Sequence, residues 1–213
     1  MQWVTAAAER GDNCAVFIFE EGLHTLITRA TGLGMNIQSH LQSGRVRIEQ
    51  VDPAEMTPGE FSQRVKNSVE KYHSKVVVID SLNGYLQSMP GEKYLASHLH
   101  ELLAYLNNLG ALTLVILAQA GTIGNAMQTP VDVSYLADNI LLLRYFETRG
   151  EVRQAISIIK KRSGGHERTI RELALGPDRI RIGEPLRQFH GVLTGIPTYV
   201  GAPEPASENI DGD

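Results

Sequence analysis

The chain has little of several features that mark particular protein classes. Its 213 residues include one cysteine, Cys14, so an internal disulfide is excluded and a reducing, cytoplasmic setting is favoured. Lys and Arg number 20 against 24 Asp and Glu, and this lack of basic excess argues against a nucleic-acid-binding protein. No apolar run is long enough to span a membrane. What remains is the composition of one globular domain, 42% hydrophobic and 21% charged.

Several catalytic and metal signatures are also missing from the sequence. Neither His-Glu pair is followed by the second histidine of the His-Glu-x-x-His zinc motif, and no second cysteine is available as a ligand. The sequence contains no Gly-x-Ser-x-Gly elbow and no Gly-x-Gly-x-x-Gly dinucleotide motif. Cys14 opens an apolar run, which predicts a thiol of the core rather than a nucleophile.

Short apolar runs alternate with helical patterns over the first half of the chain, after a short helix at 2–10. Strands are predicted at 14–20, 45–51, 75–80 and 111–119, and helices at 23–33, 58–72 and 92–109. Such alternation predicts an α/β fold with a mostly parallel sheet flanked by helices. Further on, "DNILLLRYF" and "VRQAISIIKKR" flank the turn "ETRGE" as a hairpin, and "TIRELAL" and "RIRIG" predict short strands at the C-terminal edge. We expect one domain over 1–201 and a disordered acidic tail over 202–213.

Two of the predicted strands end in acidic residues. "FIFEE" ends in Glu20 and Glu21, and "VVVIDS" ends in Asp80 and Ser81. Ligands of open α/β sheets bind beyond the carboxyl ends of the strands, where an Asp can help to hold Mg²⁺ and a serine hydroxyl can lie near a metal or phosphate. A carboxylate beside a metal-bound triphosphate can accept a proton from the attacking water. The alternative, equally open on these residues alone, is that the acids stabilise the start of the next helix.

A third segment, "SIIKKRSGGHER", places cations directly before a glycine turn. On a strand, Lys160 and Arg162 share one face and Lys161 takes the other, and Gly164 and His166 follow. Cations in this position can reach a phosphate, especially one held by a neighbouring subunit. The pattern alone favours the simpler interpretation of a solvated basic hairpin tip.

Taken together, these segments resemble the KaiC family of RecA-like ATPases, over nearly the whole chain up to about Gly201. The resemblance rests on "FIFEE", "VVVIDSLNGYL", "LADNILLLRYFE", "KKRSGGHE" and "IRIGEPLRQFHGVLTGIP". It implies a RecA-type core, ATP with Mg²⁺, and a hexameric ring of identical subunits with the nucleotide between them. Signalling proteins are expected as further partners, while the composition argues against nucleic acid and a membrane.

The resemblance also implies roles for single residues. Glu20 and Glu21 match the catalytic glutamate pair, and Asp80 matches the metal-associated aspartate, which acts through water. Ser81, beside the metal-associated aspartate, is expected to contact the nucleotide. Lys160 and Arg162 match residues that reach the phosphates from the adjacent subunit, and Lys161, Gly164 and His166 belong to the same nucleotide-contacting segment. Clock proteins of the family phosphorylate a Ser-Thr pair that corresponds here to Ser134 and Tyr135. Ser134 is therefore the candidate phosphoacceptor, and the missing Thr argues against a two-site cycle.

One departure from the family is larger. The phosphate loop, Gly-x-x-x-x-Gly-Lys-Ser/Thr, should precede the glutamate strand, and the sequence contains no such motif. We therefore interpret the chain as an N-terminally truncated domain that hydrolyses ATP in its complete form, with autokinase activity as a further expectation. Two alternatives are a non-catalytic scaffold domain of the same fold and a RadA-like DNA recombination ATPase, against which the acidic balance speaks.

Overall fold

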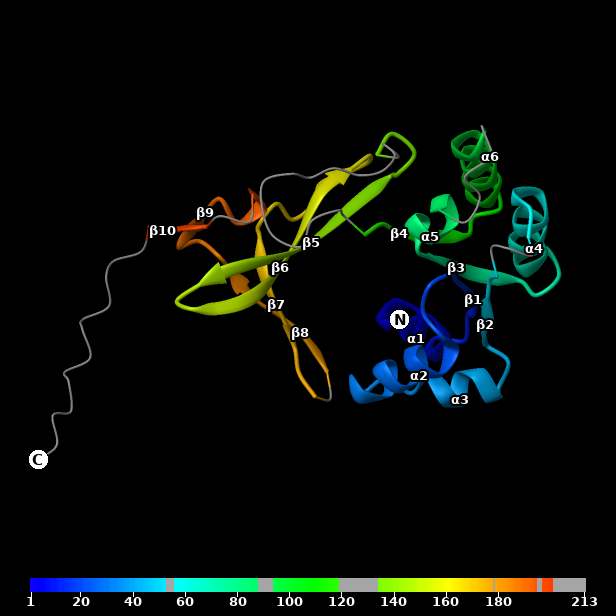
Figure 1. The fold of residues 1–213 in the computed structure, drawn as a ribbon, viewed down its shortest axis with the longest axis horizontal. Coiled ribbons are helices and arrows are strands. Elements are labelled where there is room, and N and C mark those ends of the chain that lie inside the picture. Colours follow the sequence, from blue (N-terminus) through cyan, green and yellow to red (C-terminus); the bar gives the residue numbers. More distant parts are fainter. Residues whose placement is uncertain (53–55, 88–93, 119–133, 178, 195–196, 201–213) are drawn as a thin grey trace, which may run out of the picture. The chain divides into compact units, whose positions relative to one another are not determined.

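The computed structural model describes residues 1–52, 56–87, 94–118, 134–177, 179–194 and 197–200. The chain forms two compact units, one built mainly from residues 1–138 and the other mainly from residues 139 onward (Figure 1). Each unit has its own sheet. The acidic tail expected over 202–213 lies outside the described residues.

The first unit is built on four parallel strands in the order β2-β1-β3-β4. Their bounds are β1 Asn13–Ile18, β2 Val46–Gln50, β3 Ser74–Asp80 and β4 Leu112–Ile116. The predicted parallel sheet is thereby confirmed. Ile18 at the end of β1 lies opposite Gln50 on one neighbour and Asp80 on the other, so the three strands end at the same edge.

Helices cover both faces of this sheet (Figure 1). One face carries α4 Pro58–Glu70, α5 Leu82–Gln87 and α6 Leu95–Asn108, and the other carries α1 Gln2–Glu9, α2 Leu23–Gly32 and α3 Ile37–Gln42. Because side chains alternate along a strand, Phe17 packs under α4 while Val16 and Ile18 pack against α1 to α3. Phe61 of α4 meets Phe17 edge-to-face, with 5.6 Å between ring centroids. The continuous apolar run of β1 therefore has a partner for every side chain.

The patterns located the longer helices and missed the two shortest. Helix α4 begins as expected, because Thr57 and Glu60 form a reciprocal capping box ahead of Pro58. Helices α3 and α5 have six residues each, which is less than two turns, so no 3.6-residue periodicity could reveal them. Within the part of the chain that the structure describes, no helix is both long and apolar enough to cross a membrane.

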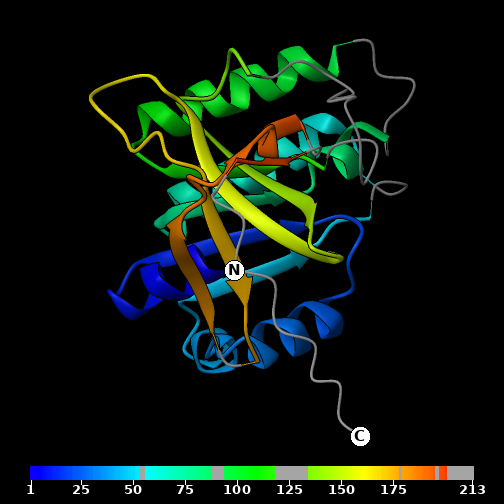
Figure 2. The same ribbon diagram turned by 90° about the vertical axis from the view of Figure 1, so that its left-hand side faces the viewer.

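The second unit carries a sheet in the order β5-β6-β7-β8. Its strands are β5 Asn139–Thr148, β6 Glu151–Lys161, β7 Arg171–Leu175 and β8 Ile180–Pro185. The short strands β9 Phe189–His190 and β10 Thr198–Tyr199 form a separate two-stranded sheet, and a 3-10 turn spans Val192–Thr194. The predicted β5–β6 hairpin is confirmed, and Figure 2 shows its twisted ribbon. Arg149 and Gly150 at its tip both have positive φ, as the commonest two-residue hairpin turn requires. Phe146, Ala155 and Val192 form the small core of this unit.

Candidate functional site

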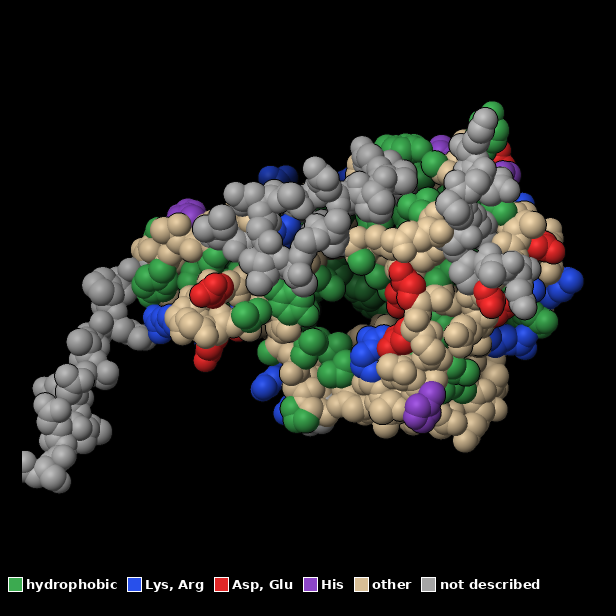
Figure 3. All heavy atoms as spheres, in the orientation of Figure 1, with side chains coloured by type: hydrophobic (Ala, Val, Ile, Leu, Met, Phe, Trp, Pro, Cys, Tyr) green, Lys and Arg blue, Asp and Glu red, His purple; other side chains and the backbone are tan. Residues whose placement is uncertain are grey.

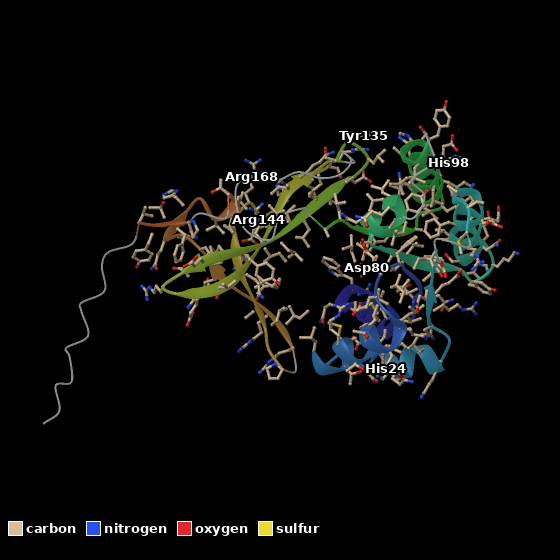
Figure 4. All side chains as sticks on the ribbon, viewed as in Figure 1. His24, Asp80, His98, Tyr135, Arg144 and Arg168 are labelled. Atoms are coloured by element: carbon tan, nitrogen blue, oxygen red, sulfur yellow. The ribbon has the colours of Figure 1, made fainter. Side chains whose placement is uncertain are left out.

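The residues that end β1 and β3 lie together at the carboxyl edge of the parallel sheet. Glu20 and Glu21 follow β1 closely. Asp80, labelled in Figure 4, is the last residue of β3, and Ser81 comes next. The backbone N–H of Phe19 donates to the carbonyl oxygen of Asp80 at 2.9 Å, which joins the two strand ends directly. The peptide bond between Asp80 and Ser81 is cis. The four acidic and hydroxyl residues expected at this edge are thus brought together.

Glu20 is held by Ser81. The hydroxyl of Ser81 donates to Oε2 of Glu20 at 2.6 Å, and the backbone N–H of Gly84 donates to the same hydroxyl oxygen at 3.2 Å. Ser81 is buried, whereas Glu20 is exposed. A fixed, buried hydroxyl therefore orients a carboxylate that reaches solvent.

Gly84, in the first turn of α5, allows this arrangement. A Cβ built on Gly84 would lie 3.1 Å from Cδ and 3.2 Å from Cγ of Glu20, closer than real Cβ atoms ordinarily pack. The helix can approach the Glu20 side chain only because this position has no side chain of its own. Asn83 fixes the other side of α5, since its amide donates to the carbonyl of Ala118 at 2.9 Å and accepts from the Ala118 N–H at 2.8 Å.

Glu21 has a different partner. Arg29 lies in α2, eight residues after Glu21. Its Nε donates to Oε1 of Glu21 at 3.1 Å and its Nη2 donates to Oε2 at 2.5 Å. The two parallel bonds are the fork geometry that guanidinium and carboxylate groups favour. The pKa of Arg29 is raised, chiefly by this hydrogen-bonded carboxylate. The adjacent glutamates are therefore not equivalent.

Asp80 is half-buried among other charges. Burial is the main cause that raises the pKa of its carboxyl group, and the negative charges of Glu21 and Glu20 raise it further. Arg29 and the amino group of Met1 act in the opposite direction. Figure 3 shows acidic side chains adjoining a basic one on the surface of this unit. Negative charge is concentrated here, and a bound cation would relieve the repulsion.

The donor set fits Mg²⁺ that is held largely by other ligands. Among the described residues, no three acidic, histidine or cysteine side chains converge as a metal cage would require. Mg²⁺ usually keeps several waters and binds through one or two carboxylates together with substrate phosphates. One aspartate at the end of β3 suits that mode of binding.

The helix-start alternative for the glutamates finds less support in the contacts. Helix α2 begins after Gly22, which has no side chain with which to cap it. The carboxylates of Glu20 and Glu21 bond instead to Ser81 and Arg29. Their hydrogen bonds thus run to the strand edge and to the body of the helix.

The basic segment belongs to the second unit. Strand β6 ends at Lys161, so Arg162 lies in the bend that follows, one residue beyond the end of the strand. The ammonium group of Lys161 donates to the carbonyl of Gly165 at 2.9 Å, across the turn where Gly164 has a φ of +73°. His166 is half-buried. The hydrogen bond between Lys161 and Gly165 thus closes the turn that follows the strand.

Ser134 lies exposed in a turn just before β5. The next residue, Tyr135, stacks at a tilt on His100 of α6 with 6.2 Å between ring centroids. Nothing in these contacts tests whether Ser134 accepts a phosphate, and that role stays a prediction.

Three residues that the sequence analysis did not single out contribute to the site: Arg29, Asn83 and Gly84. A glycine inside the apolar pattern "SLNGYL" was the one available signal, since such a glycine often marks a close approach. Arg29 reads as an ordinary solvated helix residue, and only the fold brings it to Glu21. Cys14 lies outside the site, because it is buried in the core, where burial chiefly raises the pKa of its thiol to about 11.

Comparisons with known proteins agree with this architecture. A family model described as "ATPase: KaiC" matches residues 1–187. The circadian clock protein KaiC3 of Synechocystis sp. (strain ATCC 27184 / PCC 6803 / Kazusa) is 27% identical over 203 residues, covering 95% of this chain and 40% of that protein. The circadian clock oscillator protein KaiC of Thermostichus vulcanus is 25% identical over 212 residues, covering 95% of this chain and 39% of that protein. This chain thus spans about two-fifths of the length of these relatives.

The fold has a counterpart among solved structures. The crystal structure of a KaiC-like protein from Pyrococcus horikoshii OT3 superposes with a TM-score of 0.75 at 19% identity, covering 86% of this chain and 81% of that one. A parallel sheet covered by helices and followed by an antiparallel sheet is therefore the RecA-like arrangement that the sequence predicted. From the extent of the family match, the chain belongs to the KaiC ATPase family.

Proposed function

We propose that the carboxyl edge of the first unit is the water-activating and metal side of an ATP site. Glu20 is the residue that accepts a proton from the attacking water, because it is an exposed carboxylate held in one orientation. The observation that carries this proposal is the 2.6 Å hydrogen bond from the buried Ser81 hydroxyl to Glu20. A group that needs no reorientation before the reaction is an advantage for catalysis.

Asp80 is the residue that would hold Mg²⁺, through water, when ATP is bound. Its carboxyl group lies at the end of a strand beside two other acids, where a divalent cation is electrostatically favoured. Bound Mg²⁺ would neutralise charge on the phosphates. In this proposal Ser81 lies behind Glu20 and serves chiefly to orient it, rather than to contact the nucleotide as the sequence analysis expected.

The end of β6 and the loop after it are proposed as the second contact with the nucleotide. Lys160, Lys161 and Arg162 bring three cations to one segment, and Gly164 turns the backbone toward His166. The family resemblance supports a ring, expected to be hexameric, in which this loop approaches a nucleotide held by the adjacent subunit. Guanidinium and ammonium groups are the usual partners of phosphate oxygens.

Phosphate binding also needs a cradle of backbone N–H groups, which the family supplies through its phosphate loop. The 213 residues contain no Gly-x-x-x-x-Gly-Lys-Ser/Thr motif. We therefore expect these residues alone to bind Mg-ATP weakly and to hydrolyse it little. A form of the protein that carries such a loop, called the phosphate-loop form, should hydrolyse it.

The deciding experiment measures Mg-ATP binding by calorimetry and phosphate release, on the 213 residues and on the phosphate-loop form. Replacing Glu20 by Gln in the phosphate-loop form should lower kcat by about 10²- to 10⁴-fold, as expected for loss of a general base. Full activity of the Glu20→Gln protein would refute the proposed role. Tight Mg-ATP binding by the 213 residues would refute the requirement for the loop.

The absence of the phosphate loop from the sequence also favours a second candidate, a non-catalytic scaffold domain of the same fold. This candidate predicts that the phosphate-loop form has no ATPase activity while it still assembles with itself or with a signalling protein. Sedimentation of both forms, with and without Mg-ATP, distinguishes the two functions.

A further inference from the structure

We propose that Arg29 is a positioning residue that withdraws Glu21 from the glutamate pair and leaves Glu20 as the single carboxylate available to activate water. This inference rests on the proposed function and assigns unequal roles to two adjacent acids. It starts from the contacts of the two side chains.

The partners of the two glutamates differ in kind. Glu20 accepts from a neutral hydroxyl through Oε2, and this is the contact described for its carboxylate. Glu21 accepts from Arg29 through both oxygens, at 3.1 and 2.5 Å. A carboxylate with both oxygens engaged by a guanidinium is held in the plane of that fork, so it is not free to turn toward a water molecule.

The fold makes the pairing of Glu21 with Arg29 local and reproducible. Arg29 stands on α2 one position before the buried Ala30 and three after the buried Leu26, so the packing of α2 sets where the guanidinium begins. The fork of an arginine matches a carboxylate in two bonds, which a lysine cannot reproduce. Arg29 thus fixes Glu21 by geometry as well as by charge.

The chain offers a closely matched control. Arg64 of α4 pairs with Glu49 of β2 at 2.5 Å, the same shortest distance as in the Arg29–Glu21 pair. The side chains of Arg29 and Arg64 are 53% and 52% exposed, so their replacement should disturb the fold equally little. Glu49, however, belongs to β2 and not to the edge formed by Glu20 and Asp80.

The first test needs no nucleotide and uses the 213-residue chain. The Nε–H resonance of Arg29 should exchange slowly with water in the wild type, because that proton is engaged by Glu21. The exchange should become fast in Glu21→Gln and stay slow in Glu20→Gln. Fast exchange in the wild type, or equal exchange in both variants, would overturn the proposal whether or not the protein is an ATPase.

The second test is a double-mutant cycle in the phosphate-loop form, in which kcat is measured. We expect Glu21→Gln to keep at least about a tenth of the wild-type kcat, whereas Glu20→Gln loses about a hundredfold or more. In the Arg29→Gln background, the loss caused by Glu20→Gln should shrink at least about threefold, because the released Glu21 can take part. Arg64→Gln should leave the Glu20→Gln loss unchanged.

If Arg29 has a merely structural role, Glu20→Gln should lower kcat by the same factor with and without Arg29→Gln. Such independent effects would overturn the proposal. Arg29→Lys keeps the charge without the fork, and we expect it to behave like Arg29→Gln in the cycle. If the phosphate-loop form has no ATPase activity, the proposed function fails, while the exchange measurement still decides whether Arg29 holds Glu21.

Discussion

Gly84 lies against Phe19 so closely that a Cβ built on Gly84 would come within 2.5 Å of the Cβ of Phe19. Neither backbone can yield easily, because Phe19 follows β1 directly and its ring packs against Phe61, with 5.3 Å between centroids. This contact sets the distance between α5 and the strand end that carries Glu20.

We therefore expect Gly84→Ala to lower the free energy of unfolding by about 1–3 kcal/mol, as overpacking in a core usually does. Urea denaturation followed by the fluorescence of Trp3, the single tryptophan, measures the change in the first unit. Gly32→Ala is the control, since a Cβ there meets nothing within 4 Å and the residue also lies in a helix. Equal stability of the two variants would contradict the close approach.

Ser81→Ala removes the hydrogen bond to Glu20 and leaves the buried N–H of Gly84 without its acceptor. An unpaired buried donor costs about 1–3 kcal/mol, so the free energy of unfolding should fall by that amount. In the phosphate-loop form kcat should also fall, because Glu20 loses its orientation.

Ser43→Ala is the control for this variant. The hydroxyl of Ser43 is exposed and donates to the carbonyl of His40, so its removal should change the free energy of unfolding by less than about 0.5 kcal/mol. A Ser81→Ala protein as stable as Ser43→Ala would show that the Ser81–Glu20 bond contributes nothing.

We expect the charge of Asp80 to lower the free energy of unfolding at neutral pH. Its pKa is raised on folding, chiefly by burial, so the folded state binds its proton more tightly than the unfolded state does. The stability from this preference is present at low pH and is lost as the pH rises from the unfolded pKa through the higher folded pKa.

Asp80→Asn should therefore raise the free energy of unfolding at pH 7 by up to about 1 kcal/mol, because it removes a half-buried negative charge that lies beside other acidic groups. The difference from the wild type should narrow at acidic pH, where Asp80 is protonated. Urea denaturation across this pH range measures it. A variant less stable than the wild type at pH 7 would refute the destabilising role of the charge.

Cys14 should be nearly inert toward thiol reagents in the folded protein. Burial raises its pKa to about 11, so only about one thiol in a thousand is ionised at pH 8, and the group is also shielded from the reagent. Reaction with a disulfide reagent should become at least about 100-fold faster in denaturing urea, where the thiol regains an ordinary pKa. Similar rates in both conditions would show that Cys14 is accessible.

The sequence carried much of the fold because several of its signals are local. An apolar run such as 75–80 predicts a buried strand in an α/β chain. The start of α4 depends on a capping box between Thr57 and Glu60, which are three residues apart in the chain. The hairpin between β5 and β6 was visible for the same reason, since its turn lies within one short segment. Helices α3 and α5 were not predicted from the sequence, because six residues are too few to display a helical period.

By itself the sequence determined that Glu20, Glu21, Asp80 and Ser81 would meet at one edge, since parallel strands of one sheet end together. Only the tertiary structure decided which hydrogen-bond partner each of these side chains takes, because the partners come from separate elements of the fold. Ser81 lies 61 residues from Glu20 and takes that carboxylate, while Arg29 reaches Glu21 from the body of α2. The closeness of Gly84 to Phe19 belongs to the same category, since packing distance is a property of the folded core and of no local pattern.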